Sequence, residues 1–85
     1  MAYLDIVWDL DDDPMGNVWH IAEHGLSKED VEHVLCDPSK IGVSRSSGRP
    51  IAFGYTESRT YIAVVYEEVD EDSVYPVTAF ELEED

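Results

Sequence analysis

The sequence predicts an α+β domain in which two N-terminal helices pack on one face of a mainly antiparallel sheet, in the order β-α-α-β-β-β-β. Three observations support this class. Residues 14–36 place apolar side chains at helical spacing, residues 41–80 place them at strand spacing, and one short strand precedes the helices. Helices that are segregated along the chain from a run of strands are typical of α+β proteins. The 85 residues are therefore predicted to form a single domain, residues 1–85.

The first strand is predicted at residues 3–8, which are rich in aromatic and β-branched side chains. The acidic stretch at residues 9–13 is interpreted as a solvated loop, because its carboxylates do not have the spacing of an EF-hand calcium loop. Asp13 followed by Pro14 fits an N-cap with proline at the first helical position. The first helix is therefore expected over residues 14–24.

A short segment is expected to end the first helix and to begin the second. Gly25 can adopt the left-handed conformation that ends many helices. Ser27 and Asp30 have the spacing of a capping box, in which each side chain accepts a hydrogen bond from the backbone N–H of the other residue. Pro38 disfavours helix at the residue before it, so the second helix is expected over residues 28–36.

Four strands are expected after the helices, at residues 41–45, 50–56, 61–66 and 74–80. The second of them alternates large with small side chains, which predicts one crowded face and one open face. The third is apolar on both faces and is expected to be the most buried strand. Pro76 cannot donate to a hydrogen-bond ladder, so it indicates a sheet edge or a bulge in the last strand.

The histidines and the cysteine give weak chemical signals. Cys36 is the single cysteine, so no internal disulfide can form and a cytoplasmic location is expected. Cys36 ends an apolar helical pattern and is expected to be a small buried residue. His20 and His24 are four residues apart and could face one metal ion or small ligand, which leaves a sensor as one hypothesis. A pair of histidines alone does not define a metal site, so neither metal nor cofactor is expected.

Charge is distributed unevenly along the chain, whose formal net charge is −15. Residues 39–66 carry Lys40, Arg45, Arg49 and Arg59 against one acid, Glu57, whereas the flanking segments are strongly acidic. Repulsion makes binding to nucleic acid or to an anionic membrane unexpected. No apolar run approaches the length that is needed to cross a membrane.

Several segments resemble the BrnT-type toxins of the RelE/ParE-like superfamily. The resemblance is carried by Val7-Trp8-Asp9, Asn17, the block from Glu23 to Val31, Cys36-Asp37-Pro38, Phe53-Gly54, Ala63 to Tyr66, and Thr78-Ala79. It implies the RelE/BrnT-like fold and a ribonuclease that inhibits translation as the toxin of a type II toxin-antitoxin pair, with an antitoxin as partner. The chain departs from this family where basic residues are expected, since Glu23 precedes His24 and Phe80-Glu81 follow Thr78-Ala79.

The leading functional hypothesis is a non-catalytic protein-interaction module with a toxin-like fold. Its candidate surface for a partner or an anion combines Arg45, Arg49 and Arg59 with Tyr55, Tyr61 and Tyr66, because arginine and aromatic residues are enriched at interfaces. A protein partner, or a second copy of the chain, is expected to dock on the sheet. The competing interpretation is that these arginines pair with acidic loops of their own chain.

The alternative hypothesis is the ribonuclease that the resemblance implies. His24 would act as general acid or base, Tyr66 would contact the substrate, and Arg45, Arg49 or Arg59 would hold phosphate. The candidate catalytic residues are therefore His24, Arg49 and Tyr66.

Overall fold

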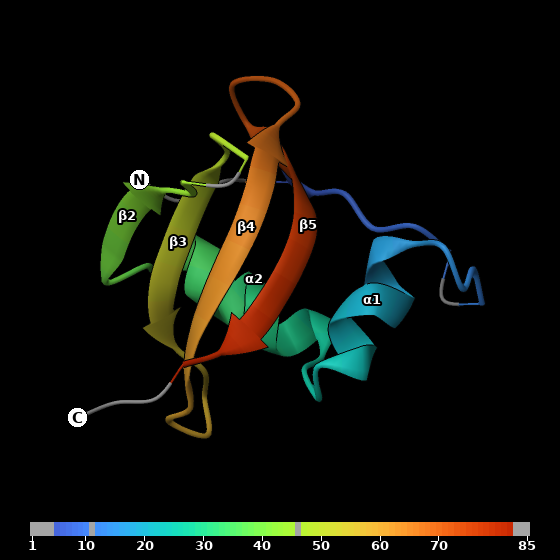
Figure 1. Cartoon of the computed structure of the whole chain (residues 1–85), viewed down its shortest axis with the longest axis horizontal. Coiled ribbons are helices and arrows are strands. Elements are labelled where there is room, and N and C mark those ends of the chain that lie inside the picture. The colour runs from blue at the N-terminus through green and yellow to red at the C-terminus, as the bar shows by residue number, and fades with distance from the viewer. Residues whose placement is uncertain (1–4, 11, 46, 83–85) are drawn as a thin grey trace.

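A single five-stranded sheet forms the centre of the protein (Figure 1), whose computed structural model describes residues 5–10, 12–45 and 47–82. The elements are β1 (Asp5–Ile6), α1 (Asn17–Glu23), α2 (Lys28–Cys36), β2 (Lys40–Val43), β3 (Pro50–Tyr55), β4 (Tyr61–Glu68) and β5 (Ser73–Glu81). The strand order is β1-β5-β4-β3-β2, with β1 parallel to β5 and every other pair antiparallel. The predicted α+β class and element order are confirmed. Within the described residues, no helix is long and apolar enough to span a membrane.

The prediction that both helices pack on one face of the sheet is correct for α2 only. Figure 1 shows α2 behind β3 and β4, whereas α1 lies next to β5 at the side of the sheet. Ile21 of α1 and Val31 of α2 nevertheless belong to the same buried core. The face of the sheet opposite α2, which is turned toward the viewer in Figure 1, is covered by no element of the described chain.

The side-chain pattern of β3 explains why α2 packs on one face only. Ala52 is buried in the core, and a Cβ atom built on Gly54 would lie 3.3 Å from Cγ1 of Val34 in α2. The small residues of β3 therefore face α2 and let it approach closely. The predicted alternation is confirmed, since Ile51, Phe53 and Tyr55 remain partly exposed on the other face.

The core lies between α2 and the central strands. Ile62, Val64 and Tyr66 of β4 are buried there together with side chains of both helices. In β4 the five residues from Ile62 to Tyr66 are buried in succession, which confirms it as the most buried strand. The pairing of β4 with β5 is irregular beside Pro76. Val65 of β4 lies opposite Thr78, and the next residue, Tyr66, lies opposite Pro76, so β5 has one extra residue at this point. Of the two features that Pro76 indicated, a sheet edge or a bulge, the structure has the bulge.

The junction between the helices forms as the sequence predicts. Gly25 has a φ of 79°. Its N–H donates to the Ala22 carbonyl, and the Leu26 N–H donates to the Ile21 carbonyl, which together make a Schellman motif. The capping box is also present, because the Asp30 N–H donates to Oγ of Ser27 and the Ser27 N–H donates to Oδ2 of Asp30.

The start of the first helix was predicted wrongly. The helix begins at Asn17 with Gly16 as its N-cap residue, not at Pro14. Oδ1 of Asp13 instead accepts from the Met15 N–H, which makes a local turn before the helix. The N–H of Asn17 donates to Oδ2 of the distant Asp9, so the acceptor at this helix end comes from outside the local sequence.

Two further predictions are corrected. The first strand is shorter than residues 3–8: residues 3 and 4 lie outside the described chain, and the strand ends at Ile6, although the Val7 N–H still donates to the Val74 carbonyl of β5. Ile6 and Trp8 still pack against the core. Cys36 is exposed rather than buried, because the buried stripe of α2 is formed by Val31, Val34 and Leu35 and position 36 falls outside it.

Candidate functional site

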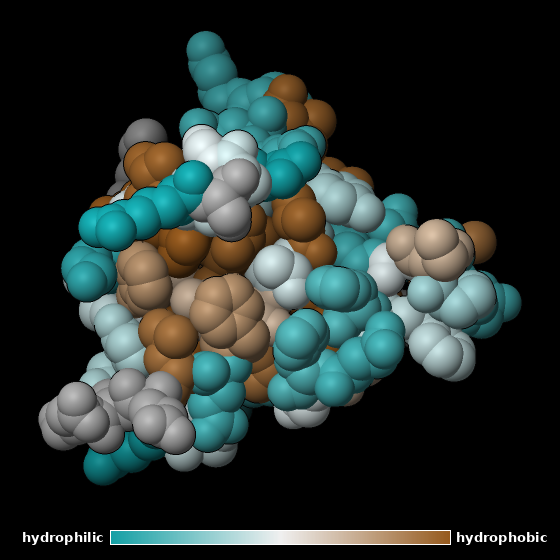
Figure 2. Space-filling model, in the orientation of Figure 1, coloured by the Kyte–Doolittle hydropathy of each residue, from teal (hydrophilic) through white to brown (hydrophobic). Residues whose placement is uncertain are grey.

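The uncovered sheet face carries a contiguous group of apolar and aromatic side chains, here called the open-face patch. Strand alternation and register bring together on this face Ile51, Phe53, Tyr55, Tyr61, Ala63, Val65 and Phe80. Ala63 lies between Phe53 on one neighbouring strand and Phe80 on the other. Figure 2 shows this apolar surface in the middle of the face, surrounded by hydrophilic residues.

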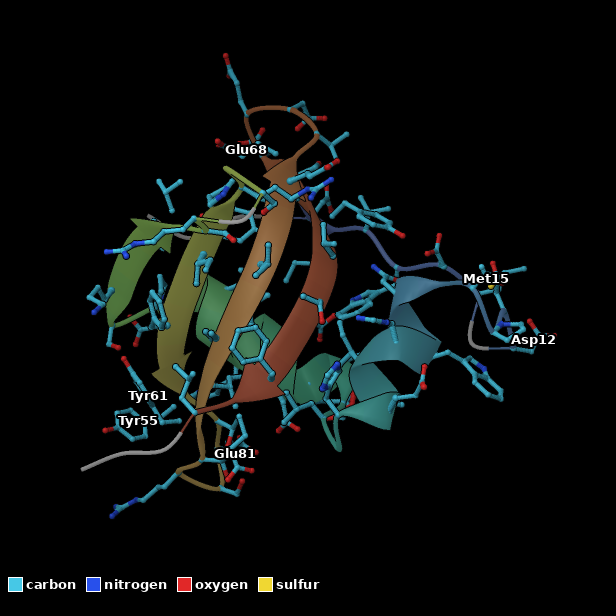
Figure 3. The ribbon with its side chains drawn as sticks, in the orientation of Figure 1. Asp12, Met15, Tyr55, Tyr61, Glu68 and Glu81 are labelled. Carbon is cyan, nitrogen blue, oxygen red and sulfur yellow. The ribbon has the colours of Figure 1, made fainter. Side chains whose placement is uncertain are left out.

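Ring contacts hold the aromatic side chains of the patch in place. The ring centroids of Tyr55 and Tyr61 are 4.9 Å apart, and those of Phe53 and Tyr61 are 6.5 Å apart with the rings 19° from parallel. Figure 3 shows Tyr55 and Tyr61 beside one another near the β3–β4 turn. Nζ of Lys40 lies 4.8 Å from the centroid of Phe53, a cation-π contact worth about 0.5–1 kcal/mol at an exposed site. The patch is therefore an ordered surface before any partner arrives.

The three predicted arginines do not converge. Nε of Arg49 donates to Oε1 of Glu67 at 2.7 Å, so for this arginine the prediction of pairing within the chain is confirmed. Arg45 is exposed in the β2–β3 turn, at the same end of β3 as Arg49. Arg59 lies in the β3–β4 turn, at the opposite end of β3, with a φ of 67°. One anion cannot contact all three.

The candidate catalytic residues also lie apart. Tyr66 is only 2% exposed and packs in the core, on the side of the sheet that faces α2. Arg49 pairs with Glu67, which follows Tyr66 but points to the opposite face. His24 is exposed at the C-terminal end of α1, where its ring centroid lies 5.4 Å from that of His20. The fold places these residues in three different environments.

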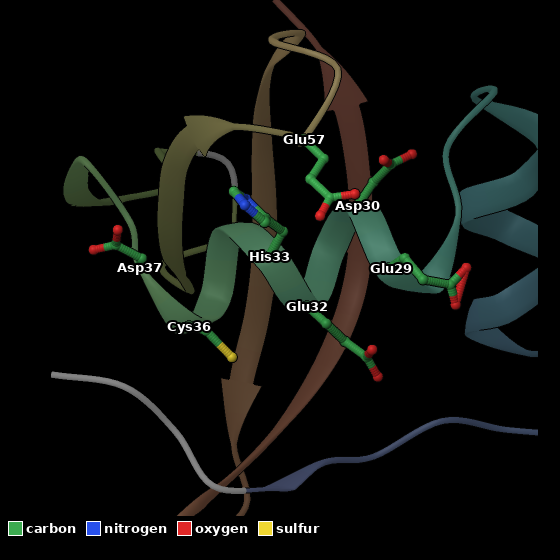
Figure 4. A pocket seen from close by; sticks show the side chains of 7 residues that line it. All are labelled: Glu29, Asp30, Glu32, His33, Cys36, Asp37 and Glu57. Atoms are coloured by element: carbon green, nitrogen blue, oxygen red, sulfur yellow. The ribbon is translucent and has the colours of Figure 1, made fainter.

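A carboxylate-rich hollow of about 460 Å³ lies over the outer side of α2. It is lined by Glu29, Asp30, Glu32, His33, Cys36, Asp37 and Glu57. Figure 4 shows that Glu57 reaches toward Asp30 from the β3–β4 turn, whereas Glu29, Glu32 and Cys36 leave α2 in different directions. Nδ1 of His33 contacts the Tyr55 carbonyl oxygen at 3.0 Å. Across the part of the chain that the structure describes, no group of three or more His, Cys, Asp or Glu side chains is arranged to hold a metal ion.

Sequence reasoning missed a buried polar network that joins α1 to the sheet. Asn17 is 3% exposed, and its Nδ2 donates to the carbonyl oxygens of Val7 at 3.1 Å and Pro76 at 3.0 Å. Its Oδ1 accepts from the Asp9 N–H at 2.9 Å. Oδ2 of Asp9 accepts from the Asn17 N–H and from the Tyr75 hydroxyl, the latter at 2.6 Å. The sequence signal for it was that Asp9 and Asn17 are both among the residues that carry the BrnT-type resemblance.

The protonation states of this network are fixed at neutral pH. The hydrogen bond from Tyr75 is the main reason that the pKa of Asp9 lies below its ordinary value, and the Asn17 N–H lowers it further. The same bond, with burial and nearby carboxylates, raises the pKa of Tyr75 to about 12. Asp9 is therefore charged and Tyr75 neutral in the physiological range. This arrangement suits a structural link and gives no group that exchanges protons near pH 7.

The fold and the open-face patch define a small α+β protein with one covered and one uncovered sheet face. The chain matches no protein-family model, and comparison with curated proteins and with solved structures gave no match. The BrnT-type resemblance therefore stays a prediction, and function is argued from the geometry.

Proposed function

We propose that this chain is a cytoplasmic, non-catalytic protein-interaction module and that a partner docks on the open-face patch. The observation that supports this is the location of the seven side chains of the patch on a sheet face that no described element covers. Burial of apolar surface contributes roughly 25 cal/mol per Å². The core side of the sheet already obtains this gain from α2. On the open side Ala63 and Val65 are buried among their neighbours, and the five larger side chains of the patch, which stay partly exposed, can gain further burial from another molecule.

The composition of the patch also fits protein recognition. Tyrosine and phenylalanine are enriched at the centres of protein interfaces, and an ordered aromatic surface loses little conformational entropy on binding. The contacts of Tyr61 with Tyr55 and Phe53 provide such order in the free chain. Tyr55, which is 42% exposed, offers its ring to a partner.

The ribonuclease alternative has weaker support from the geometry. Phosphoryl chemistry on RNA requires a general acid or base and a cation close to one reacting phosphate. His24 lies at the end of α1, Tyr66 is buried, and the guanidinium of Arg49 is bound to Glu67. We expect no RNA cleavage by the wild-type chain. Cleavage that is lost in Arg49→Ala would favour the toxin function instead.

Site-specific photo-crosslinking tests the interaction module directly. The photoreactive residue p-benzoylphenylalanine replaces one patch residue at a time, namely Phe53, Tyr55 or Tyr61. In a matched control it replaces the exposed Glu29 on α2, at the other side of the sheet. In the source cells we expect a discrete protein adduct from position 55 and none from position 29. Equal adducts from both positions, or none from positions 53, 55 and 61, would contradict the proposal.

A further inference from the structure

Acidic side chains lie on several sides of the open-face patch. The end of β4 and the turn that follows it carry Glu67, Glu68, Asp70, Glu71 and Asp72, all of them exposed. Figure 3 labels Glu68 at one end of the sheet, Glu81 at the other end, and Asp12 beside α1. Glu67 pairs with Arg49, and Glu68 also has an interaction within the chain. The β4–β5 turn makes one end of the patch negative, whereas the β3–β4 turn at the other end carries both Glu57 and Arg59.

This charge distribution restricts the occupant of the patch. At a net charge of −15, a second copy of the chain meets like charge as it approaches, and so does an acidic protein. A basic partner is steered toward the patch and finds carboxylates where its lysines and arginines emerge from the contact. Lys40 lies on the β2 side, where its ammonium group is already engaged over the ring of Phe53.

The shape of the sheet restricts the occupant further. β4 has eight residues, which correspond to a length of about 26 Å, and a helix of roughly 17 residues covers that length. One face of the same sheet already carries a helix, α2. A second helix on the free face would complete a helix-sheet-helix sandwich of the kind in which both sheet faces are buried.

We propose that the partner docks a basic amphipathic helix on the open-face patch. Its apolar stripe contacts the aromatic side chains, and lysines or arginines at one of its ends meet the acidic β4–β5 turn. This inference rests on the proposed function and adds the chemical class and secondary structure of the ligand.

A displayed library of helical peptides of about 18 residues, randomised at their surface positions, tests the inference without knowledge of the natural partner. The library is selected on the wild-type chain, and the enriched peptides are synthesised and titrated by calorimetry at low and high salt. We expect enriched peptides with a net positive charge, an apolar stripe and basic residues toward one end. Affinity should fall with salt, because the charged rim is exposed to solvent.

Three variants locate the binding and separate its apolar and charged parts. Tyr55→Ser with Tyr61→Ser should weaken the enriched peptides at least about tenfold, since both rings lie within the patch. Glu71→Gln with Asp72→Asn, both in the β4–β5 turn, should weaken them about two- to fivefold and should reduce the salt dependence. Trp19→Ser, on the exposed side of α1, is the matched control and should leave affinity unchanged. Circular dichroism of each variant checks that it is folded.

The possible results distinguish failure of this inference from failure of the proposed function. Selection of neutral or acidic peptides that bind the double tyrosine variant more weakly than the wild-type chain would overturn the inference of a basic helix. It would keep the patch as a docking surface. If scrambled versions of the basic peptides bind equally well, the binding is unspecific charge attraction. That result would also overturn the inference of a basic amphipathic helix. No enrichment, or peptides that bind the double tyrosine variant equally well, would overturn both. A sedimentation dimer that is abolished by the tyrosine substitutions would identify a second copy as the occupant instead.

Discussion

Replacement of Asn17 by alanine is expected to be among the most destabilising single substitutions outside the apolar core. The alanine side chain removes three hydrogen bonds and leaves their backbone partners behind. These are the carbonyl oxygens of Val7 and Pro76 and the N–H of Asp9. The methyl group of alanine is also too short to hold α1 at its present distance from the first and last strands.

The three backbone groups that lose their hydrogen-bond partner determine how much stability Asn17→Ala costs. The bond to Pro76 is buried, and an unsatisfied buried group costs about 1–3 kcal/mol. The bonds to Val7 and Asp9 are only part-buried, so water can replace them at a smaller cost. We therefore expect Asn17→Ala to lower the free energy of unfolding by about 2–4 kcal/mol. A domain of 85 residues has roughly 4–13 kcal/mol in total, so the loss is a large fraction.

Urea unfolding followed by tryptophan fluorescence measures this change, since Trp8 packs against the core and its Nε1 donates to Glu32. The midpoint should fall in Asn17→Ala while the slope with urea stays the same. His20→Ala, one turn further along α1 and exposed, is the control and should change stability by less than about 0.5 kcal/mol. Asn17→Asp keeps the acceptor but loses both donated bonds, so we expect it to destabilise at least as much as alanine at pH 7.

A loss no larger than that of His20→Ala would refute this reasoning. It would mean that water, or a small movement of α1, satisfies the three backbone groups without the asparagine.

Three other substitutions probe neighbouring features. A Cβ atom on Gly16 would lie 2.6 Å from Cβ of Asp9, so Gly16→Ala should cost about 1–3 kcal/mol in urea unfolding, whereas Gly42→Ala, whose Cβ meets only an ordinary contact at 3.5 Å, should be nearly neutral. Gly25→Ala forces alanine to a φ of 79° and should cost about 1–2 kcal/mol, with Gly25→Asn intermediate. Because the pKa of Tyr75 is raised to about 12, its hydrogen bond contributes stability below pH 10 that is lost as the pH rises from 10 to 12. Tyr75→Phe should lack this alkaline loss, and ultraviolet titration should show one late-titrating tyrosine fewer; an unchanged titration would contradict the assignment.

Features that depend on neighbouring residues were predictable from the sequence. The capping box of Ser27 and Asp30 and the left-handed Gly25 need only a few consecutive residues, and both are present. The alternation in β3 and the burial of β4 follow from side-chain periodicity, which survives in almost any packing of these strands. The positions of Tyr55 and Tyr61 on an uncovered face followed from the same periodicity.

Features that depend on contacts between distant residues were not predictable. The local pattern Asp13-Pro14 is a sound helix start, yet Asp9 and Asn17 move the start to Asn17 through bonds that close only in the folded chain. The arginines of residues 39–66 are close together in sequence, but the length of β3 separates Arg59 from the other two. Arginines that are close together in the sequence are therefore not all close together in the fold.

The order of the strands bears on how the chain assembles. β2, β3, β4 and β5 pair with their neighbours in sequence, so each pairing closes only a short loop. The N-terminal segment joins them across much larger separations, 59 residues from Asn17 to Pro76 and 66 residues from Asp9 to Tyr75. We expect α2 and the four strands β2 to β5 to form first, and the N-terminal segment that contains β1 and α1 to dock on them last. In native-state hydrogen exchange, the amides of α1 should then open at lower free energy than those of β4 and behave as a separate cooperative unit.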